Sequence, residues 1–226
     1  MQKSALAFIL IVILALSAGL YWRAHRYDER AVVTPVTGDT RTAYFAGGCF
    51  WCTESDFEKL PGVREAISGY SGGTTTDPTY TSVSSHTTGH LETVEVRYDP
   101  SAVSYDALIR YFFAHIDPTD AGGQFADQGD SYTSAVFYQN ETERDAALAE
   151  MKRLTDAGAY PKPLVTSVRA LETFYPAEEY HQDYWKKNSL RYEYYRSGSG
   201  RDRYLEQACA WRQAKSLSCE EAPRRK

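Results

Sequence analysis

The cysteine at position 49 is the residue with the clearest chemical potential. It follows a short apolar segment and the pair Gly47-Gly48, at the point where a helix is predicted to begin. A thiol in the first turn of a helix faces unpaired N–H groups and a partial positive charge, which favour the thiolate. Phe50 and Trp51 follow directly and provide an apolar wall. The pattern predicts a reactive nucleophile beside a small apolar pocket, rather than an inert core cysteine.

Three further cysteines, Cys52, Cys209 and Cys219, accompany Cys49. Four cysteines in 226 residues are too few for a disulfide scaffold, so these thiols need another explanation. Cys49 and Cys52 form the C-x-x-C pattern of thiol–disulfide oxidoreductases, which is one alternative function. A four-cysteine zinc site is a weaker alternative, because Cys209 and Cys219 lack the tight spacing of a zinc knuckle.

Other polar candidates lie in predicted loops and at a strand end. Glu92 follows Gly89-His90-Leu91 where a strand begins, and a partly buried carboxyl there could hold a proton near neutral pH. Tyr80 and Tyr132 lie in loops rich in Pro, Asp and Gly. The residues alone leave the alternatives open, namely an exposed strand glutamate and two ordinary surface tyrosines.

The elements that must position these residues alternate between strands and helices. Strands are predicted over residues 42–46, 63–70, 91–98, 135–138 and 165–171, and helices over 50–59, 105–115, 141–157 and 178–187. The period-two alternation of residues 91–98 predicts one solvated face. Strands alternating with helices within residues 42–196 predict one globular domain, a layered α/β or α+β sandwich.

The segments flanking this domain have different compositions. Residues 5–22 are uncharged, and the pair Tyr21-Trp22 at their end favours an uncleaved membrane anchor over a cleaved signal peptide. We therefore expect an apolar helix within residues 1–26 that anchors or exports the domain to the cell envelope. Residues 27–41 are a predicted linker. Residues 197–226 are a predicted tail, flexible at its glycine-rich start and then helical over 205–216.

Composition excludes some functions. The hydrophobic fraction of 42% is sufficient for a folded core. The formal charge is −5 and basic residues do not cluster, so nucleic-acid binding is disfavoured.

Several short motifs occur along residues 42–205 beside those already described. In chain order they are Gly48-Cys49-Phe50-Trp51, Gly69-Tyr70-Ser71-Gly72-Gly73, Pro78-Thr79-Tyr80, Thr88-Gly89-His90-Leu91-Glu92, Tyr98-Asp99-Pro100, Asp117-Pro118-Thr119, Gly122-Gly123-Gln124-Phe125-Ala126-Asp127, Tyr132 and the run from Phe174 to Gln182. Together, and in this order, they resemble the methionine sulfoxide reductase A family. The resemblance implies an α+β fold, a two-layer α/β sandwich with a plait-like (ferredoxin-like) βαβ core.

The resemblance also implies a reaction. Cys49 would attack the sulfoxide sulfur of an oxidised methionine and become a sulfenic acid, and the oxygen would leave as water when that sulfenic acid is resolved. Glu92 would donate the proton that lets the oxygen leave. Tyr80 and Tyr132 would hydrogen-bond that oxygen, and Asp127 would shape the polar side of the site. The expected substrate is the S epimer, since each sulfoxide epimer has its own enzyme.

Phe50 and Trp51 would hold the S-methyl group of the substrate, which is oxidised methionine in proteins or peptides, with the free amino acid as a further candidate. We expect no cofactor and no metal ion. A membrane-tethered module that binds oxidised methionine without turnover is a non-enzymatic alternative.

Recycling requires a thiol that converts the sulfenic acid to a disulfide, which a thioredoxin-like donor then reduces. Many relatives have glycine where this chain has Cys52. We expect Cys209, on the glycine-preceded tail, to resolve the sulfenic acid, with Cys52 close behind and Cys219 as a relay.

Overall fold

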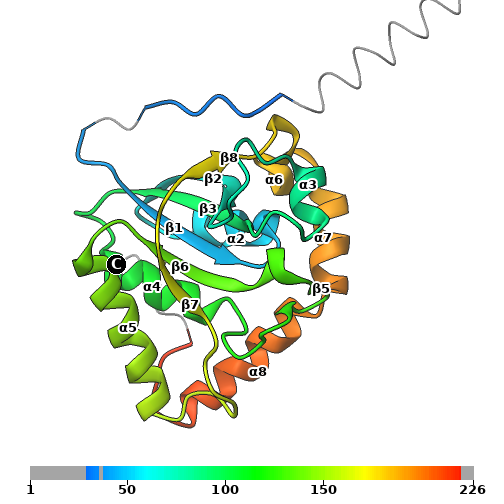
Figure 1. Ribbon diagram of the computed structural model, residues 1–226. Coiled ribbons are helices and arrows are strands. Elements are labelled where there is room, and N and C mark those ends of the chain that lie inside the picture. Colours follow the sequence, from blue (N-terminus) through cyan, green and yellow to red (C-terminus); the bar gives the residue numbers. More distant parts are fainter. Residues whose placement is uncertain (1–28, 36–37, 220–226) are drawn as a thin grey trace, which may run out of the picture.

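The computed structural model describes residues 29–35 and 38–219 (Figure 1). The apolar helix expected within residues 1–26 lies outside this part of the chain. Among the helices that the structure does describe, none is long and apolar enough to cross a membrane. The strands are β1 (Arg41–Gly47), β2 (Val63–Ser71), β3 (Leu91–Tyr98), β4 (Gly123–Gln124), β5 (Asp127–Gln128), β6 (Ser134–Tyr138), β7 (Ser167–Ala170) and β8 (Phe174–Pro176). The α-helices are α2 (Phe50–Glu58), α3 (Tyr80–Ser84), α4 (Tyr105–Ala114), α5 (Glu141–Asp156), α6 (Tyr184–Lys187), α7 (Ser189–Gly198) and α8 (Arg201–Gln213), and the 3-10 helices are η1 (Asp130–Tyr132) and η2 (Glu179–His181).

Six strands form one mixed sheet in the order β7-β6-β1-β3-β2-β8. β1 pairs antiparallel with β3 on one side and with β6 on the other. β2 and β8 continue antiparallel beyond β3, and β7 joins β6 in parallel. Helix α2 follows β1 and packs on β2 and β3, whereas α5 packs on β6 and β7. The predicted mixed α/β fold is confirmed.

Three helices begin at residues whose side chains cap them. Thr79, Ser104 and Asn140 each accept a hydrogen bond from a backbone N–H in the first turn of α3, α4 and α5. Such caps satisfy amides that have no partner inside the helix. They explain why the predicted starts of α4 and α5 agree with the structure.

Hydrophobic residues fill both faces of the sheet. On one face Phe45 stacks against Phe57 of α2 and Phe112 of α4, with ring centroids 4.9 and 5.0 Å apart. On the other face Tyr44 and Phe137 pack with residues of the segment that joins β7 to β8. Figure 1 shows this yellow segment crossing the sheet. The sheet is therefore covered on both sides.

Because the second face of the sheet is also covered, the structure contradicts the prediction that residues 91–98 have one solvated face. All eight residues of β3 are buried. Glu95 forms an ion pair with Arg97, with Nε and Oε1 2.7 Å apart, and also accepts a hydrogen bond from the Tyr44 hydroxyl. The prediction was wrong because these polar side chains satisfy one another instead of facing water.

The prediction of one continuous helix over residues 178–187 was also wrong. The structure has η2 and α6, separated by Gln182 and Asp183. The Gln182 side chain bonds to the N–H and the carbonyl of Ser68 in β2, and Asp183 has a left-handed backbone with φ of 52°. A side chain paired with a strand backbone, followed by a left-handed residue, interrupts the helix.

The C-terminal segment differs from its description as a tail with a flexible start. Residues 197–198 end α7, and Gly200, with φ of 83°, precedes α8. Helix α8 begins four residues earlier than predicted and packs against α4. Arg201, at its start, is 1% exposed. Helix α7 was not predicted, because its start has no side-chain cap and its polar, tyrosine-rich sequence has few aliphatic residues.

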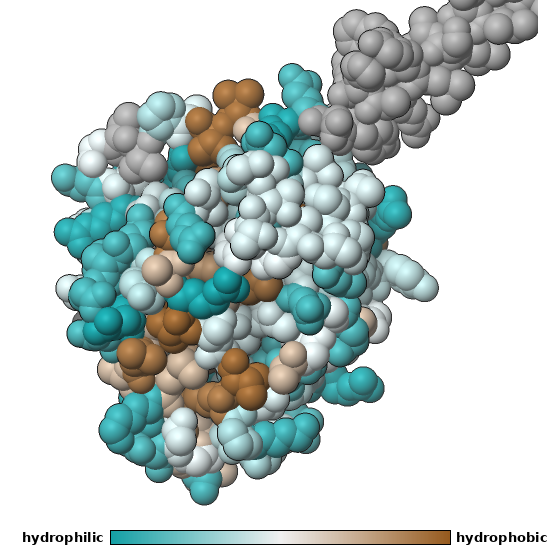
Figure 2. Space-filling model, viewed as in Figure 1, coloured by the Kyte–Doolittle hydropathy of each residue, from teal (hydrophilic) through white to brown (hydrophobic). Residues whose placement is uncertain are grey.

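One face of the molecule carries its hydrophobic side chains as separate patches (Figure 2). Beside them lies a broad pale region of intermediate hydropathy, over the part of the molecule that carries α3 in Figure 1.

Candidate active site

Cys49 is the N-cap residue of α2 and is 6% exposed. Its carbonyl accepts hydrogen bonds from the N–H groups of Cys52 and Thr53 at 3.1 and 3.2 Å. Gly48, just before it, has φ of +80°, and a Cβ at this position would lie 2.4 Å from the Cβ of Gln124. Glycine is therefore required by both conformation and space in the loop that presents the thiol.

Glu92, in β3, lies against the start of the same helix. Its Oε2 accepts a hydrogen bond from the Phe50 N–H at 2.9 Å, and its side chain is buried. Burial raises the pKa of Glu92 to about 8, with a contribution from the Asp127 carboxylate, while the bond from Phe50 acts in the opposite direction. A carboxyl with this pKa holds its proton at neutral pH and can act as a general acid.

The structure brings all seven of the predicted catalytic and substrate-binding residues to one pocket. They come from the start of α2, from α3, from β3 and from the segment 127–132. An eighth residue, Tyr195 of α7, completes the lining and was missed from the sequence. The lining residues are Cys49, Phe50, Trp51, Tyr80, Glu92, Asp127, Tyr132 and Tyr195.

Tyr195 closes the pocket through Asp127. Its hydroxyl donates a hydrogen bond to the Asp127 carboxylate, and its ring meets Trp51 edge to face with centroids 6.0 Å apart. Tyr195 stands in a run of tyrosines in which no spacing singles it out. Only the tertiary packing of α7 reveals its place.

The pocket has an aromatic side and a polar side. On the aromatic side, Phe50 stacks on Tyr80 with ring centroids 6.4 Å apart, and Trp51 stacks on Tyr184 with ring centroids 3.8 Å apart. On the polar side, burial raises the pKa of Tyr80 to about 12 and also raises that of Tyr132. Both hydroxyls therefore stay protonated and can donate hydrogen bonds to an oxygen in the pocket.

The expectation that the helix start lowers the Cys49 pKa was wrong. Burial raises the pKa of the Cys49 thiol well above its ordinary value, followed by effects of Cys52 and of the Glu92 and Asp127 carboxylates. The Phe50 N–H, which could have stabilised a thiolate, is bonded to Glu92. The Phe50 amide of the helix start thus serves the acid rather than the sulfur.

Cys52 is the thiol beside Cys49. It is 1% exposed and packs with Tyr184 and Tyr192. Its hydrogen bond with Cys49 lowers its pKa, and the positive charge of Arg201 contributes in the same direction. The two buried thiols are therefore hydrogen-bonded partners.

The four cysteines do not converge. Cys209 and Cys219 form a disulfide, whereas Cys49 and Cys52 are free thiols. Neither Cys209 nor Cys219 lines the pocket of Cys49. The four-thiolate zinc site considered from the sequence is therefore not formed, and the resolving role of Cys209 stays a prediction.

Comparison with known proteins shows the family to which this chain is similar. The family model described as peptide methionine sulfoxide reductase matches residues 41–213. The peptide methionine sulfoxide reductase MsrA of Bacillus subtilis is 48% identical over 163 residues, which is 72% of this chain and 92% of that protein. The MsrA/MsrB protein of Vibrio cholerae is 46% identical over 198 residues, and these cover 88% of this chain but only 52% of the relative.

Solved structures show the same fold. Methionine sulfoxide reductase A of Corynebacterium diphtheriae superimposes with a TM-score of 0.61 at 32% identity, covering 68% of this chain and 77% of that chain. Reduced Mxr1 of Saccharomyces cerevisiae gives a TM-score of 0.63 at 26% identity, covering 70% and 91% of the two chains. The chain belongs to the peptide methionine sulfoxide reductase A family.

Proposed function

We propose that this chain is a peptide-methionine (S)-S-oxide reductase that reduces oxidised methionine in peptides or proteins. The observation that carries this function is the convergence of Cys49 and a protonated Glu92 on one pocket with an aromatic side. A sulfoxide needs a nucleophile at its sulfur, a proton at its oxygen and an apolar surface for its methyl group. The pocket supplies all three.

The reaction transfers one oxygen atom and two electrons. The Cys49 sulfur attacks the sulfoxide sulfur while Glu92 gives its proton to the oxygen. Tyr80 and Tyr132 donate hydrogen bonds to that oxygen as it gains negative charge, and Asp127, held by Tyr195, borders it. In sum, the sulfoxide becomes a thioether and the Cys49 thiol becomes a sulfenic acid. The proton that the thiol loses replaces the proton that Glu92 gave to the oxygen.

The aromatic residues Phe50 and Trp51 hold the S-methyl group. Trp51 is fixed from behind, because its Nε1 donates to Nδ1 of His181 at 3.0 Å and its ring stacks on Tyr184. A rigid aromatic surface on one side and hydroxyl donors on the other can distinguish the two sulfoxide epimers. This asymmetry supports selection of one epimer, and the resemblance to the family assigns it as the S epimer.

For recycling, Cys52 is the resolving thiol that the geometry favours over Cys209. It lies beside Cys49 and has the lowered pKa of an attacking thiol, whereas Cys209 is already paired with Cys219. Attack of Cys52 on the Cys49 sulfenic acid forms one disulfide and releases one water molecule. A thioredoxin-like dithiol then reduces that disulfide.

A thiol–disulfide oxidoreductase that uses Cys49 and Cys52 alone is the alternative. Such an enzyme has no need of a buried acid with a pKa of about 8, nor of tyrosine hydroxyls around the thiol. The pocket therefore favours the sulfoxide reductase.

The four strands β6-β1-β3-β2 with α2 and α4 form, in this proposal, the ferredoxin-like plait. The strand order, and a helix following both β1 and β3, support it. An experimental structure with α2 and α4 on opposite faces of the sheet would contradict it.

The uncharged residues 5–22 support membrane attachment in the cell envelope. In fractionated cells, the full chain should remain in the membrane pellet after a carbonate wash. Release of the whole chain by that wash would contradict attachment.

The proposed reaction is tested with the full chain in mild detergent, incubated with dithiothreitol and each sulfoxide epimer of N-acetylmethionine amide. We expect thioether from the S epimer only, with no product from the Cys49→Ser variant. Reduction of a disulfide substrate without reduction of either sulfoxide would instead support the oxidoreductase.

A further inference from the structure

The residues just before the family match lie against the catalytic domain. Residue 30 forms an antiparallel bridge with Glu178. The Ala31 N–H donates to the Ala177 carbonyl at 3.1 Å, and the Glu179 N–H donates to the Glu29 carbonyl at 2.9 Å. Residues 29–31, which we call the strap, thus pair with residues 177–179 like an added strand, although the sequence predicted only a linker here.

Arg30 ties the strap to two separate segments of the domain. Its Nη1 donates to the Pro176 carbonyl at 2.8 Å and its Nη2 donates to the Pro78 carbonyl at 2.6 Å. Its guanidinium also lies over the ring of Tyr175, 5.8 Å from the centroid. A planar guanidinium can hold two carbonyls at once in a fixed geometry, which a lysine ammonium on a flexible stem cannot reproduce.

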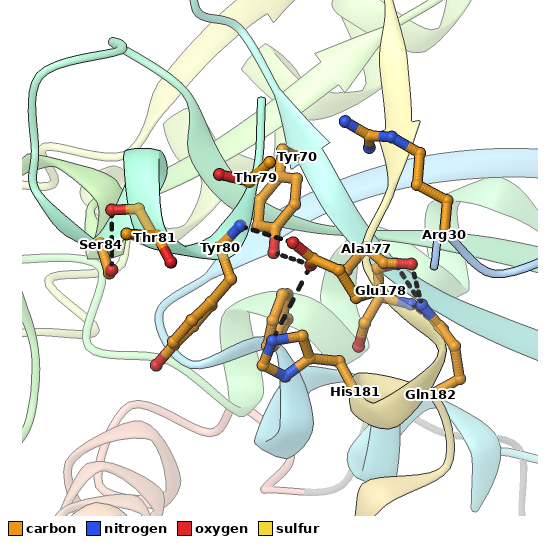
Figure 3. Close-up of polar contacts among 12 residues, drawn as sticks. Arg30, Tyr70, Thr79, Tyr80, Thr81, Ser84, Ala177, Glu178, His181 and Gln182 are labelled. Carbon is orange, nitrogen blue, oxygen red and sulfur yellow. Dashed lines mark hydrogen bonds and ion pairs between the residues drawn. The ribbon is translucent and has the colours of Figure 1, made fainter. Parts of the chain in front are cut away.

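The two prolines that provide these carbonyls each stand two positions before a residue that shapes or supports the pocket. Tyr80 follows Pro78, and Glu178 follows Pro176. The buried Glu178 carboxylate joins the two segments, since Oε1 accepts from the Tyr80 N–H and Oε2 accepts from the Tyr70 hydroxyl, both at 2.8 Å. Figure 3 shows this carboxylate between the two tyrosines, with Arg30 extended beside them.

The segment after Glu178 carries a second contact with the pocket. The ring of His181 lies 4.8 Å from that of Phe50 and 4.5 Å from that of Tyr80, centroid to centroid. Its Nδ1 accepts the hydrogen bond from Trp51. A shift of residues 176–181 would therefore disturb the Tyr80 ring as well as its N–H.

We propose that Arg30, which lies outside the family match, is a positioning residue that holds the α3 start and the Glu178 segment in register, and so fixes the Tyr80 hydroxyl in the substrate pocket. This inference rests on the proposed function, in which Tyr80 hydrogen-bonds the sulfoxide oxygen. It assigns to the strap a part in setting the geometry of the pocket.

The test is a double-mutant cycle in the full chain with Arg30→Ala and Tyr80→Phe. Misplacing a group by about 1 Å can cost up to about 100-fold, so we expect Arg30→Ala to lower kcat/KM by about tenfold or more. In the Tyr80→Phe background, the same change should cost less than about twofold. Simple loss of folded protein would instead lower activity by the same factor in both backgrounds.

Two further variants serve as a conservative replacement of Arg30 and as a control at another arginine. Arg30→Lys keeps the charge but loses the double contact, so its kcat/KM should lie between those of the wild type and Arg30→Ala. Arg64→Ala removes a surface arginine that pairs with Asp99 at 2.7 Å with its side chain 50% exposed, and its activity should equal that of the wild type. Equal effects of Arg30→Ala in the two backgrounds, or wild-type activity of Arg30→Ala, would overturn the inference.

A second measurement is independent of turnover. The Tyr80 amide, which donates to Glu178, should exchange with solvent at least about tenfold faster in Arg30→Ala, while amides in the centre of β3 keep their rates. Unchanged exchange at Tyr80 would contradict the positioning role even if the protein proved inactive on sulfoxides. Absence of activity in the wild type would count only against the proposed reaction.

Discussion

The backbone N–H of Phe50 donates a hydrogen bond to the carboxyl of Glu92, with 2.9 Å between nitrogen and oxygen. The first turn of α2 is thereby directed at the acid, although Cys49 stands directly before that turn. The thiol and the acid share one pocket with little access to water. As a result both groups hold their protons more firmly than usual, and the proton needed at the sulfoxide oxygen is available where it is used.

Replacing Glu92 by glutamine should separate thiol reactivity from reductase activity. The negative charge of Glu92 raises the Cys49 pKa, so a neutral glutamine lowers it, and alkylation of Cys49 by iodoacetamide at pH 9 becomes faster. Reduction of the sulfoxide should nevertheless fall by about 100-fold or more, because the proton donor is lost.

The control is Glu172→Gln at an exposed position, which should change neither rate. Slower alkylation of Cys49 in Glu92→Gln, or undiminished reduction of the sulfoxide, would contradict the role of Glu92 as the acid.

The resolving thiol can be assigned with a thioredoxin-like donor. Cys52→Ser should lose multiple turnover with this donor, since Cys52 lies beside Cys49 and is a free thiol. Cys209→Ser should keep at least about half of the activity, because Cys209 is paired with Cys219 away from the pocket lining. Loss of turnover in Cys209→Ser with full activity in Cys52→Ser would reverse the assignment.

Gly48→Ala should damage the nucleophile loop. The positive φ and the 2.4 Å approach to Gln124 together predict a loss of about 1–3 kcal/mol in the free energy of unfolding, measured in urea. Gly198→Ala is the matched control, since a Cβ there meets nothing within 4 Å. Equal stability of the two variants would show that the loop tolerates a side chain.

Stability should depend on pH through Glu54. Burial raises the pKa of this carboxyl to about 8, while its hydrogen bond with Ser68 acts in the opposite direction. The folded pKa lies above the unfolded value near 4.5, so the folded chain holds a proton that the unfolded chain has lost between about pH 4.5 and 8. The free energy of unfolding should therefore fall as pH rises through this window, by at most about 1.4 kcal/mol per pH unit.

Glu54→Gln should flatten that dependence, as measured by urea unfolding from pH 5 to 8. Glu92, with its similarly raised pKa, contributes a slope of the same sign that remains in this variant. An unchanged slope in Glu54→Gln would show that Glu54 titrates at its ordinary value.

Much of this architecture was accessible from the sequence because local signals agree with the tertiary structure. Strands β1 and β6 and helices α2, α4 and α5 were placed to within a few residues, since their apolar spacing is local and, for α4 and α5, so are their capping residues. The interruption of the helix predicted over residues 178–187 could not be predicted from the sequence, because it depends on hydrogen bonds between the Gln182 side chain and the distant strand β2. The same holds for the buried β3, whose second face is covered by a segment far along the chain.

The pocket residues were found mainly through family resemblance, and their grouping in space agrees with it. Tyr195 escaped because a tyrosine in a tyrosine-rich helix has no distinguishing neighbours. The raised pKa of Cys49 escaped because sequence shows a helix start but not which group its amides serve. Burial and the Glu92 contact, both tertiary properties, decide the outcome.

The most direct test of the central claim is a single turnover without external reductant. The full chain, with Cys49 and Cys52 reduced and Cys209 paired with Cys219, is mixed with excess S-sulfoxide, and thioether and free thiols are counted together. We predict one thioether per chain with loss of two thiols in the wild type, one thioether with a trappable Cys49 sulfenic acid in Cys52→Ser, and none in Cys49→Ser. Failure of the wild type to form any thioether would contradict the account.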